Sequence, residues 1–255
     1  MVSEVEIQTV NESNLERLGF FCYKSKRKTP GYVKKLDWVR KRLVEGMRIH
    51  ILYEDGVSKG FIESIPGHFA WRAVNAEGYL FIHCMWVVGK AKGKGYGSLL
   101  LDQCIQDAKE GDFKGVAVLA SGETWLAGCD FFNRSGFDVI ETAAPAFTLM
   151  ALSFNDTSKP SLPSDWSSRI KAFGPDLTVI YNDQCPYIDR MKNAVYKVAD
   201  TLKIEAREVR LSSASEVQRR SPSPYGVYNV IYRGDLIVSH PIGTDALLQL
   251  MQSRV

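Results

Sequence analysis

Apolar and polar residues recur along the 255-residue chain in patterns that predict a succession of strands and helices. Alternation over residues 5–10 predicts a first strand, and the apolar run 80–88 predicts an apolar strand. After this run, Leu100, Leu101, Cys104 and Ala108 recur at the spacing of one helical face. Continued to residue 153, the pattern predicts the order β-α-α-β-β-β-α-β-α-β-β.

A turn rich in lysine and glycine, residues 89–98, joins the apolar strand 80–88 to the helix that follows; it is called the lysine-glycine turn below. Glycines at 93, 95 and 97 let the backbone approach a ligand and direct N–H groups at it, and the start of a helix adds partial positive charge. Lys90, Lys92 and Lys94 add formal charge, so the turn is predicted to bind an anion. It fits neither the P-loop nor the dinucleotide fingerprint. The alternative is an ordinary solvated turn.

Two motifs resemble those of the GCN5-related N-acetyltransferase (GNAT) family. Residues 92–97, Lys-Gly-Lys-Gly-Tyr-Gly, resemble its pyrophosphate loop Gln/Arg-x-x-Gly-x-Gly/Ala, with lysine in the first position. Residues 130–137 resemble its Phe-Tyr-x-x-x-Gly-Phe signature. The resemblance covers about residues 2–153. It implies an α/β (α+β) GNAT fold, whose mixed, mostly antiparallel sheet has splayed central strands. It also implies acetyl-CoA as co-substrate, no metal, and a small-molecule or peptide amine as acceptor in a ternary complex.

The family motifs also imply which residues hold the cofactor. The strand end would offer backbone groups to the pantetheine arm, the turn would bind the diphosphate, and Asn133 could add a hydrogen bond. The residues implied are Met85, Trp86, Val87, Lys92, Gly93, Lys94, Gly95, Tyr96, Gly97, Ser98 and Asn133.

The catalytic residues are less clearly indicated. His83 is a candidate base, since an ordinary histidine pKa suits neutral pH; Glu63 is a second, acting through water. The alternatives are a buried structural histidine and a solvated strand-end charge. Phe132 stands where the family has its tyrosine acid, so Cys129, one helical turn earlier, or water would replace it. Trp71, Arg72, Trp86 and Trp125 could line an acceptor pocket, or be core.

The rest of the chain has another character. Prolines and serines in 154–175 predict a linker between a GNAT domain, 1–153, and a smaller domain, 176–255, with the β-α-β-α-β-β-α order of the thioredoxin fold. Cys185-Pro186-Tyr187 resembles a glutaredoxin motif without its second cysteine, because Ile188 takes that place. Such a tail behind an acetyltransferase resembles the YoaP-like proteins.

The tail motif suggests an alternative function. At a helix start the pKa of Cys185 should be lowered, and Pro224 or Pro222 would be the cis-proline that faces it. The chain could then be a thiol-redox or mixed-disulfide protein that uses Cys185, with the front domain as an acyl-CoA-binding module. A structural tail with an inert cysteine is the other possibility.

Composition narrows the setting. The net charge of +3 and the lack of a basic stripe argue against nucleic acid as a partner. No run is long and apolar enough to span a membrane, and no signal peptide is predicted. Five scattered cysteines without zinc spacing favour a reducing, cytoplasmic location. The identity of the acceptor and the oligomeric state stay open.

Overall fold

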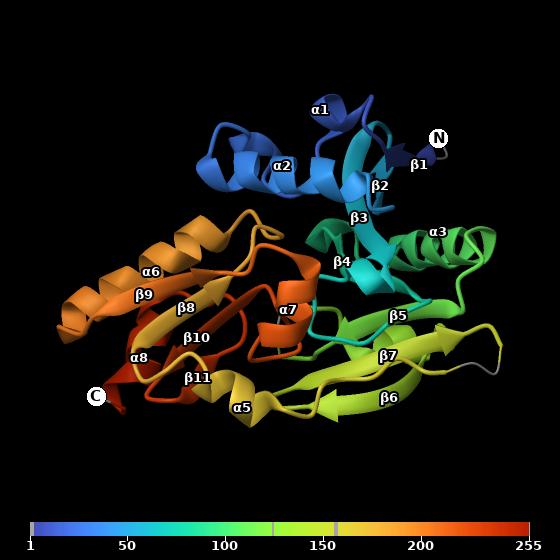
Figure 1. The fold of residues 1–255 in the computed structure, drawn as a ribbon. Coiled ribbons are helices and arrows are strands. Elements are labelled where there is room, and N and C mark those ends of the chain that lie inside the picture. The colour runs from blue at the N-terminus through green and yellow to red at the C-terminus, as the bar shows by residue number, and fades with distance from the viewer. Residues whose placement is uncertain (1–2, 124, 156–157, 255) are drawn as a thin grey trace.

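The computed structural model describes residues 3–123, 125–155 and 158–254, which form two β-sheets with helices packed around them (Figure 1). The first sheet has seven strands in the order β1-β2-β3-β4-β5-β7-β6. Their bounds are Val5–Val10, Arg48–Glu54, Val57–Pro66, Leu80–Val87, Gly115–Ala120, Asp138–Ala143 and Phe147–Ser153 for β1 to β7. Neighbours pair antiparallel except β4 and β5. The predicted mixed, mostly antiparallel sheet is confirmed.

Within the described part of the chain, four α-helices accompany this sheet: α1 (Leu15–Leu18), α2 (Pro30–Leu43), α3 (Tyr96–Glu110) and α4 (Cys129–Asn133). The predicted order of elements is therefore confirmed. The sequence pattern predicts a helix over residues 15–23; the observed α1 is shorter, because the backbone turns to a positive φ of 67° at Gly19. The sequence pattern also predicts a helical run over residues 124–134; the observed helix begins only at Cys129, and Thr124 lies outside the described residues.

The central strands separate soon after they meet. β4 and β5 pair over only three residues, from Leu80 opposite Val116 to Ile82 opposite Val118. Beyond Ile82, β4 pairs only with β3, and the N–H of Val88 donates to the carbonyl of Lys59 (2.9 Å). Because backbone groups alternate between the two edges of a strand, those of Val87 and Met85 face the opening. The predicted splay is confirmed.

The second sheet has four strands in the order β11-β10-β8-β9. They are β8 (Leu177–Tyr181), β9 (Ala206–Arg210), β10 (Tyr228–Tyr232) and β11 (Asp235–Val238), with α6 (Ile188–Leu202), α7 (Ala214–Arg220) and α8 (Thr244–Gln252) around them. A short helix, α5 (Trp166–Lys171), precedes them. The order of elements agrees with the prediction. The thioredoxin likeness and the domain boundaries stay predictions.

The cis-proline prediction is wrong. Among the described peptide bonds, the cis bond lies at Ala144–Pro145, and those before Pro222 and Pro224 are trans. The segment before β10 packs instead against the segment between β3 and β4, where the N–H of Ala73 donates to the carbonyl of Pro224 (3.2 Å).

The apolar core runs through both sheets. One cluster joins Phe81 and Phe147 of the first sheet to Val179 and Val230 of the second. Another joins Trp38 on α2 to Ile180 and Ile231. Burial of this kind contributes roughly 25 cal/mol per Å² of apolar surface. The two sheets therefore share a core, although their hydrogen-bonded ladders are separate.

None of the helices in the described ranges combines the length and the hydropathy needed to cross a bilayer.

Candidate active site

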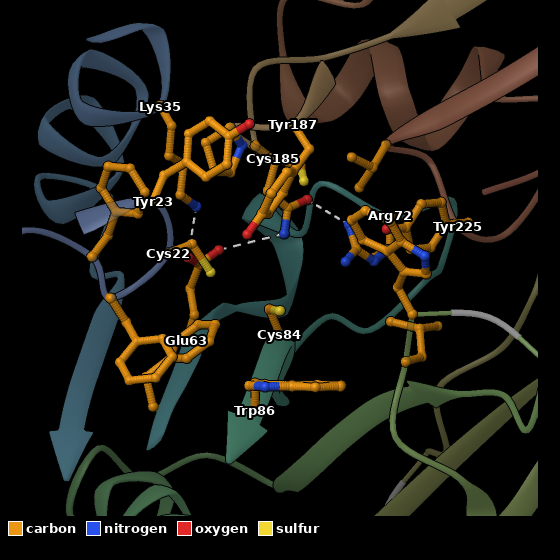
Figure 2. A pocket seen from close by; sticks show the side chains of 18 residues that line it. Cys22, Tyr23, Lys35, Glu63, Arg72, Cys84, Trp86, Cys185, Tyr187 and Tyr225 are labelled. Carbon is orange, nitrogen blue, oxygen red and sulfur yellow. Dashed lines mark hydrogen bonds and ion pairs between the residues drawn. The ribbon is translucent and has the colours of Figure 1, made fainter. Parts of the chain in front are cut away.

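A cavity of about 570 Å³ lies where the first sheet, α2 and the segment before α6 meet (Figure 2). Its wall is largely aromatic, and polar side chains enter it at a few points. The aromatic residues are Phe20, Phe21, Tyr23, Phe61, Trp86, Trp125, Tyr187 and Tyr225. The polar and thiol side chains are Lys35, Glu63, Arg72, Gln184, Cys22, Cys84 and Cys185. A few polar groups in an apolar concavity are typical of a small-molecule site.

Glu63 and Lys35 form a buried ion pair in this wall. Glu63 lies on β3 opposite Cys84 of β4, and its Oε2 is 2.6 Å from Nζ of Lys35. The Lys35 ammonium also lies 4.2 Å from the ring centre of Trp38. Burial alone would raise the pKa of Glu63, but Lys35 and His83 outweigh it and hold that pKa at about 2. Glu63 is therefore an ionised carboxylate.

His83 lies behind Glu63 and does not line the cavity. Its Nε2 accepts the backbone N–H of Trp71 (2.9 Å), so the ring proton sits on Nδ1, which is 3.5 Å from Oε1 of Glu63. Burial lowers the pKa of His83 to about 4, against the opposing effect of Glu63. This neutral, fully buried ring fits the structural alternative better than the role of a base.

Arg72 enters the cavity wall from the segment between β3 and β4. Its guanidinium donates to the carbonyls of Trp71 (3.1 Å) and His83 (2.6 Å) and to Oε1 of Gln184. It also lies 4.9 Å from the ring centre of Tyr225. Only 2% of the residue is exposed, and burial lowers the pKa of the guanidinium. All three of its acceptors are uncharged.

Three thiols face the same cavity, as Figure 2 shows for Cys22, Cys84 and Cys185. Burial raises the pKa of Cys84 to about 12 and that of Cys185 to about 11. The predicted lowering of the Cys185 pKa is therefore wrong. A hydrogen bond from the backbone of Tyr187 does favour the thiolate, but the partial loss of water around this half-buried cysteine outweighs it.

The lysine-glycine turn keeps its N–H groups available. Among the described residues, the backbone N–H groups from Gly93 to Ser98 donate no hydrogen bond to a protein acceptor, and the first to do so is that of Leu99, to Gly95 (3.1 Å). Gly93 and Gly95 have φ angles of 84° and 79°, a region that favours glycine. These free donors at the start of a 15-residue helix suit an anion.

The lysines of the turn contribute unequally. Nζ of Lys94 is bound to Oε1 of Glu54 (2.6 Å), so its charge is already balanced. Lys92 lies 4.7 Å from the ring centre of Trp86. Tyr96 is buried and also donates to Glu54, so its side chain supports the turn from behind. Ser98 is exposed in the first turn of α3.

The cavity meets the splay between β4 and β5. A small gap of about 10 Å³ is lined by Met85 and Phe132 and shares Cys84, Trp125 and Leu126 with the cavity. The backbone groups of Met85 and Val87, which face the splay, therefore lie between the lysine-glycine turn and the cavity.

Two predicted residues lie away from the cavity wall. Cys129 begins α4 and packs against the core around α3, and Asn133 is exposed at the other end of α4. Phe132, in the position of the family's tyrosine, is 1% exposed and packs between Phe131 and Phe137.

Of the four residues proposed for an acceptor pocket, Arg72, Trp86 and Trp125 line the cavity, whereas Trp71 is buried in the core. Sequence reasoning missed several others, which come from distant segments without a shared motif. These are Cys22, Tyr23, Lys35, Gln184, Tyr187 and Tyr225. Within the described ranges, His, Cys, Asp and Glu side chains form no group of three or more that could hold a metal ion.

Comparison with known proteins gives the family. Residues 13–137 match the model of the acetyltransferase (GNAT) family. The chain is also 32% identical over 249 residues to the uncharacterized N-acetyltransferase YoaP of Bacillus subtilis (strain 168), covering 96% of this chain and 97% of that protein. The chain therefore belongs to the GNAT acetyltransferase family and is a YoaP-like acyltransferase.

Solved structures resemble the chain more weakly. An N-acetyltransferase from Staphylococcus aureus Mu50 is 17% identical with a TM-score of 0.45, covering 60% of this chain and 100% of that one. The PaiA N-acetyltransferase from Thermoplasma acidophilum, in complex with coenzyme A, is 14% identical with a TM-score of 0.43, covering 59% and 99%. At this level of similarity we draw nothing from them.

Proposed function

We propose that the protein transfers the acetyl group of acetyl-CoA directly to a primary amine bound in the cavity. The observation that carries this proposal is the continuity of two features: the unpaired N–H groups of residues 93–98 and the splay that opens onto the cavity. The first would bind the diphosphate, and the backbone of Met85 and Val87 would hold the pantetheine arm. The thioester would then lie beside Cys84 and Trp86.

Among the predicted catalytic residues, Glu63 is best placed to meet the acceptor. It lines the cavity and lies opposite Cys84, whereas His83 and Cys129 do not line it. With a pKa of about 2, Glu63 is a weak base, so it accepts a hydrogen bond from the ammonium while water removes the proton. Lys35 holds the Glu63 carboxylate in place at 2.6 Å. The thiolate of coenzyme A leaves with water as its acid.

The remaining assignments extend this proposal. Residues 1–153 would form the acetyl-transfer domain, 154–175 the linker, and 176–255 a thioredoxin-like domain that supplies Gln184 to Tyr187 to the acceptor side. All five cysteines are free, which suits a reducing compartment and a cytoplasmic location.

The anion turn gives the first prediction. We expect Gly95→Ala to weaken coenzyme A binding about five- to thirtyfold, since a non-glycine residue at φ 79° is strained by roughly 1–2 kcal/mol. A Cβ at Gly95 would meet no protein atom within 4 Å, so the effect belongs to the turn and its ligand. Isothermal titration with coenzyme A measures the binding.

Gly89→Ala is the matched control, because Gly89 lies in the same turn at an ordinary φ and its Cβ also meets nothing. Release of free thiol from acetyl-CoA with a panel of amines then tests transfer. Equal binding by both variants contradicts the assignment of the turn. Binding without thiol release from any amine indicates a non-catalytic acyl-CoA-binding module.

A further inference from the structure

The buried charges around the cavity do not balance. Lys35 and Glu63 neutralise each other at 2.6 Å, which leaves the Arg72 guanidinium without an acidic partner among the residues that the structure describes. The thiols of Cys84 and Cys185 and the phenol of Tyr225 are protonated at neutral pH, because burial raises the pKa of each. An uncompensated cation in a low-dielectric site is costly, and a bound anion offsets that cost.

Arg72 also keeps hydrogen-bonding capacity. Among the described residues, its buried Nε has no acceptor, and Arg72 is one of the residues that line the cavity. Its contacts with two backbone carbonyls and one amide oxygen fix its position without cancelling its charge. A planar guanidinium matches a carboxylate better than it matches other small groups.

The side-chain amide of Gln184 lies between the carboxylate of Glu63 and the guanidinium of Arg72. Its amide nitrogen lies 3.4 Å from Oε1 of Glu63, and its amide oxygen accepts from Arg72 (Figure 2). The amide thus presents its donor to the carboxylate and its acceptor to the guanidinium. A ligand with a cationic nitrogen at one end and an oxyanion at the other would have the same polarity across the same two residues.

Glu63 and Arg72 lie on different sides of the place where the acetyl group is predicted to be. Glu63 lies opposite Cys84 at the start of the splay, whereas Arg72 lies toward Tyr225, on the other side of Cys84 in Figure 2. An amine near Glu63 would therefore face the thioester, and an acid group near Arg72 would anchor the acceptor away from it.

Resting on the proposed function, we propose that the acceptor is a zwitterionic amine, with a carboxylate bound at Arg72, an amine next to Glu63 and an apolar or aromatic body against the ring-lined wall. A plain cationic amine would leave Arg72 unpaired and would add positive charge beside Lys35.

The test compares amines that differ only in the acid group. Suitable pairs are phenylalanine with phenethylamine, 4-(aminomethyl)benzoate with 4-methylbenzylamine, and 5-aminopentanoate with pentylamine, which vary the distance between the two ends. We expect the acid of at least one pair to exceed its partner about tenfold or more in kcat/KM for acetylation, the range of a charge-assisted hydrogen bond. Equal or better acetylation of the acid-free amine in every pair overturns the proposal.

Binding without acetyl-CoA separates this proposal from the proposed function. If no amine is acetylated, acetyl transfer fails, but calorimetric titration of the same pairs still decides whether the cavity prefers the acid. Tighter binding of an acid supports the inference, and no preference in any pair overturns it.

Variants provide a second readout. Arg72→Met should abolish the preference for the acid, and Arg72→Lys should keep part of it. Arg42→Met is the matched control, because Arg42 also lies over an aromatic ring, that of Trp71, but is paired with Glu45 and lies outside the cavity. A preference that survives Arg72→Met in the folded protein contradicts the assignment. If Arg72→Met does not fold, Arg72→Lys and the wild-type comparison decide.

Discussion

Glu63, Lys35 and His83 form a buried polar group whose members depend on one another. Lys35 holds the carboxylate ionised, and His83 faces it with a neutral ring whose other nitrogen is occupied by the N–H of Trp71. Burying an ion pair stabilises a fold little, but removing one partner typically costs about 3–5 kcal/mol. These side chains therefore fix the position of the Glu63 carboxylate in the cavity wall more than they add to the stability of the fold.

His83 should make stability depend on pH. Its pKa of about 4 in the folded protein lies below the ordinary 6.5, so the folded state resists protonation while the unfolded chain accepts it. The stability contributed by the neutral ring is present above pH 6.5 and is lost as the pH falls toward 4. The loss amounts to about 3 kcal/mol.

Urea unfolding at pH 7 and at pH 4.5 measures this dependence. His83→Gln keeps an acceptor for the Trp71 N–H but cannot take up a proton, so its free energy of unfolding should fall less than that of the wild type. His240, whose pKa is also lowered by burial, is present in both proteins and cancels in the comparison. An identical decrease in the two proteins would contradict the assignment.

Helix α2 lies in close contact with the segment before α6. A Cβ built on Gly31 would lie 2.2 Å from the carbonyl oxygen of Pro186, in the segment that follows Cys185. Lys34, one turn further along α2, pairs with Asp189 at 2.7 Å. Gly31 lets α2 pack directly against the backbone before α6, and this contact closes one side of the cavity.

Gly31→Ala tests this contact between elements. Inside a helix, alanine is favoured over glycine by up to about 1 kcal/mol, so helix propensity alone would stabilise the protein. We expect the opposite, a destabilisation of about 2 kcal/mol, because α2 must move away from Pro186.

The shift in the midpoint of urea unfolding measures the effect. Gly243→Ala is the control, since Gly243 borders α8 at φ −75° and a Cβ there would meet nothing within 4 Å. A Gly31→Ala protein as stable as the wild type would show that the contact is not tight.

At the scale of the whole molecule, one apolar core joins the two sheets. Phe81 and Phe147 of the first sheet pack in one cluster with Val179 and Val230 of the second. The segment between the sheets is also attached, since Leu162 donates its N–H to Glu141 (3.0 Å). We therefore infer that the tail is part of the folding unit, and that the cavity exists only when both sheets are in place.

Truncation tests this inference. A fragment of residues 1–153 would expose the apolar surface that now packs against the second sheet, so we expect it to aggregate or to lack cooperative unfolding. The intact chain should unfold in a single calorimetric transition. Near-ultraviolet circular dichroism compares the packing of side chains in the two proteins. Two separate transitions, or a cooperatively folded fragment that binds coenzyme A, would contradict it.

The order of the elements and the lysine-glycine turn at residues 93–98 could be predicted from the sequence pattern, whereas the splay was implied only by the resemblance of two motifs to the family. The order and the turn depend on neighbours within a few residues: the periodicity of apolar positions, the positive φ that glycine allows at Gly93 and Gly95, and the free N–H groups at the start of α3. Interactions of such short range leave a pattern that can be read along the chain.

The acceptor side was decided only by the tertiary structure. Arg72 and Gln184 are 112 residues apart, and Glu63 and Gln184 are 121 apart, so no local motif connects them. The motif around Cys185 indicated a reactive thiolate, yet the partial burial of this cysteine in the wall of the cavity favours the protonated thiol. Burial and charge pairing are properties of packed surfaces, and the sequence does not contain them until distant segments meet.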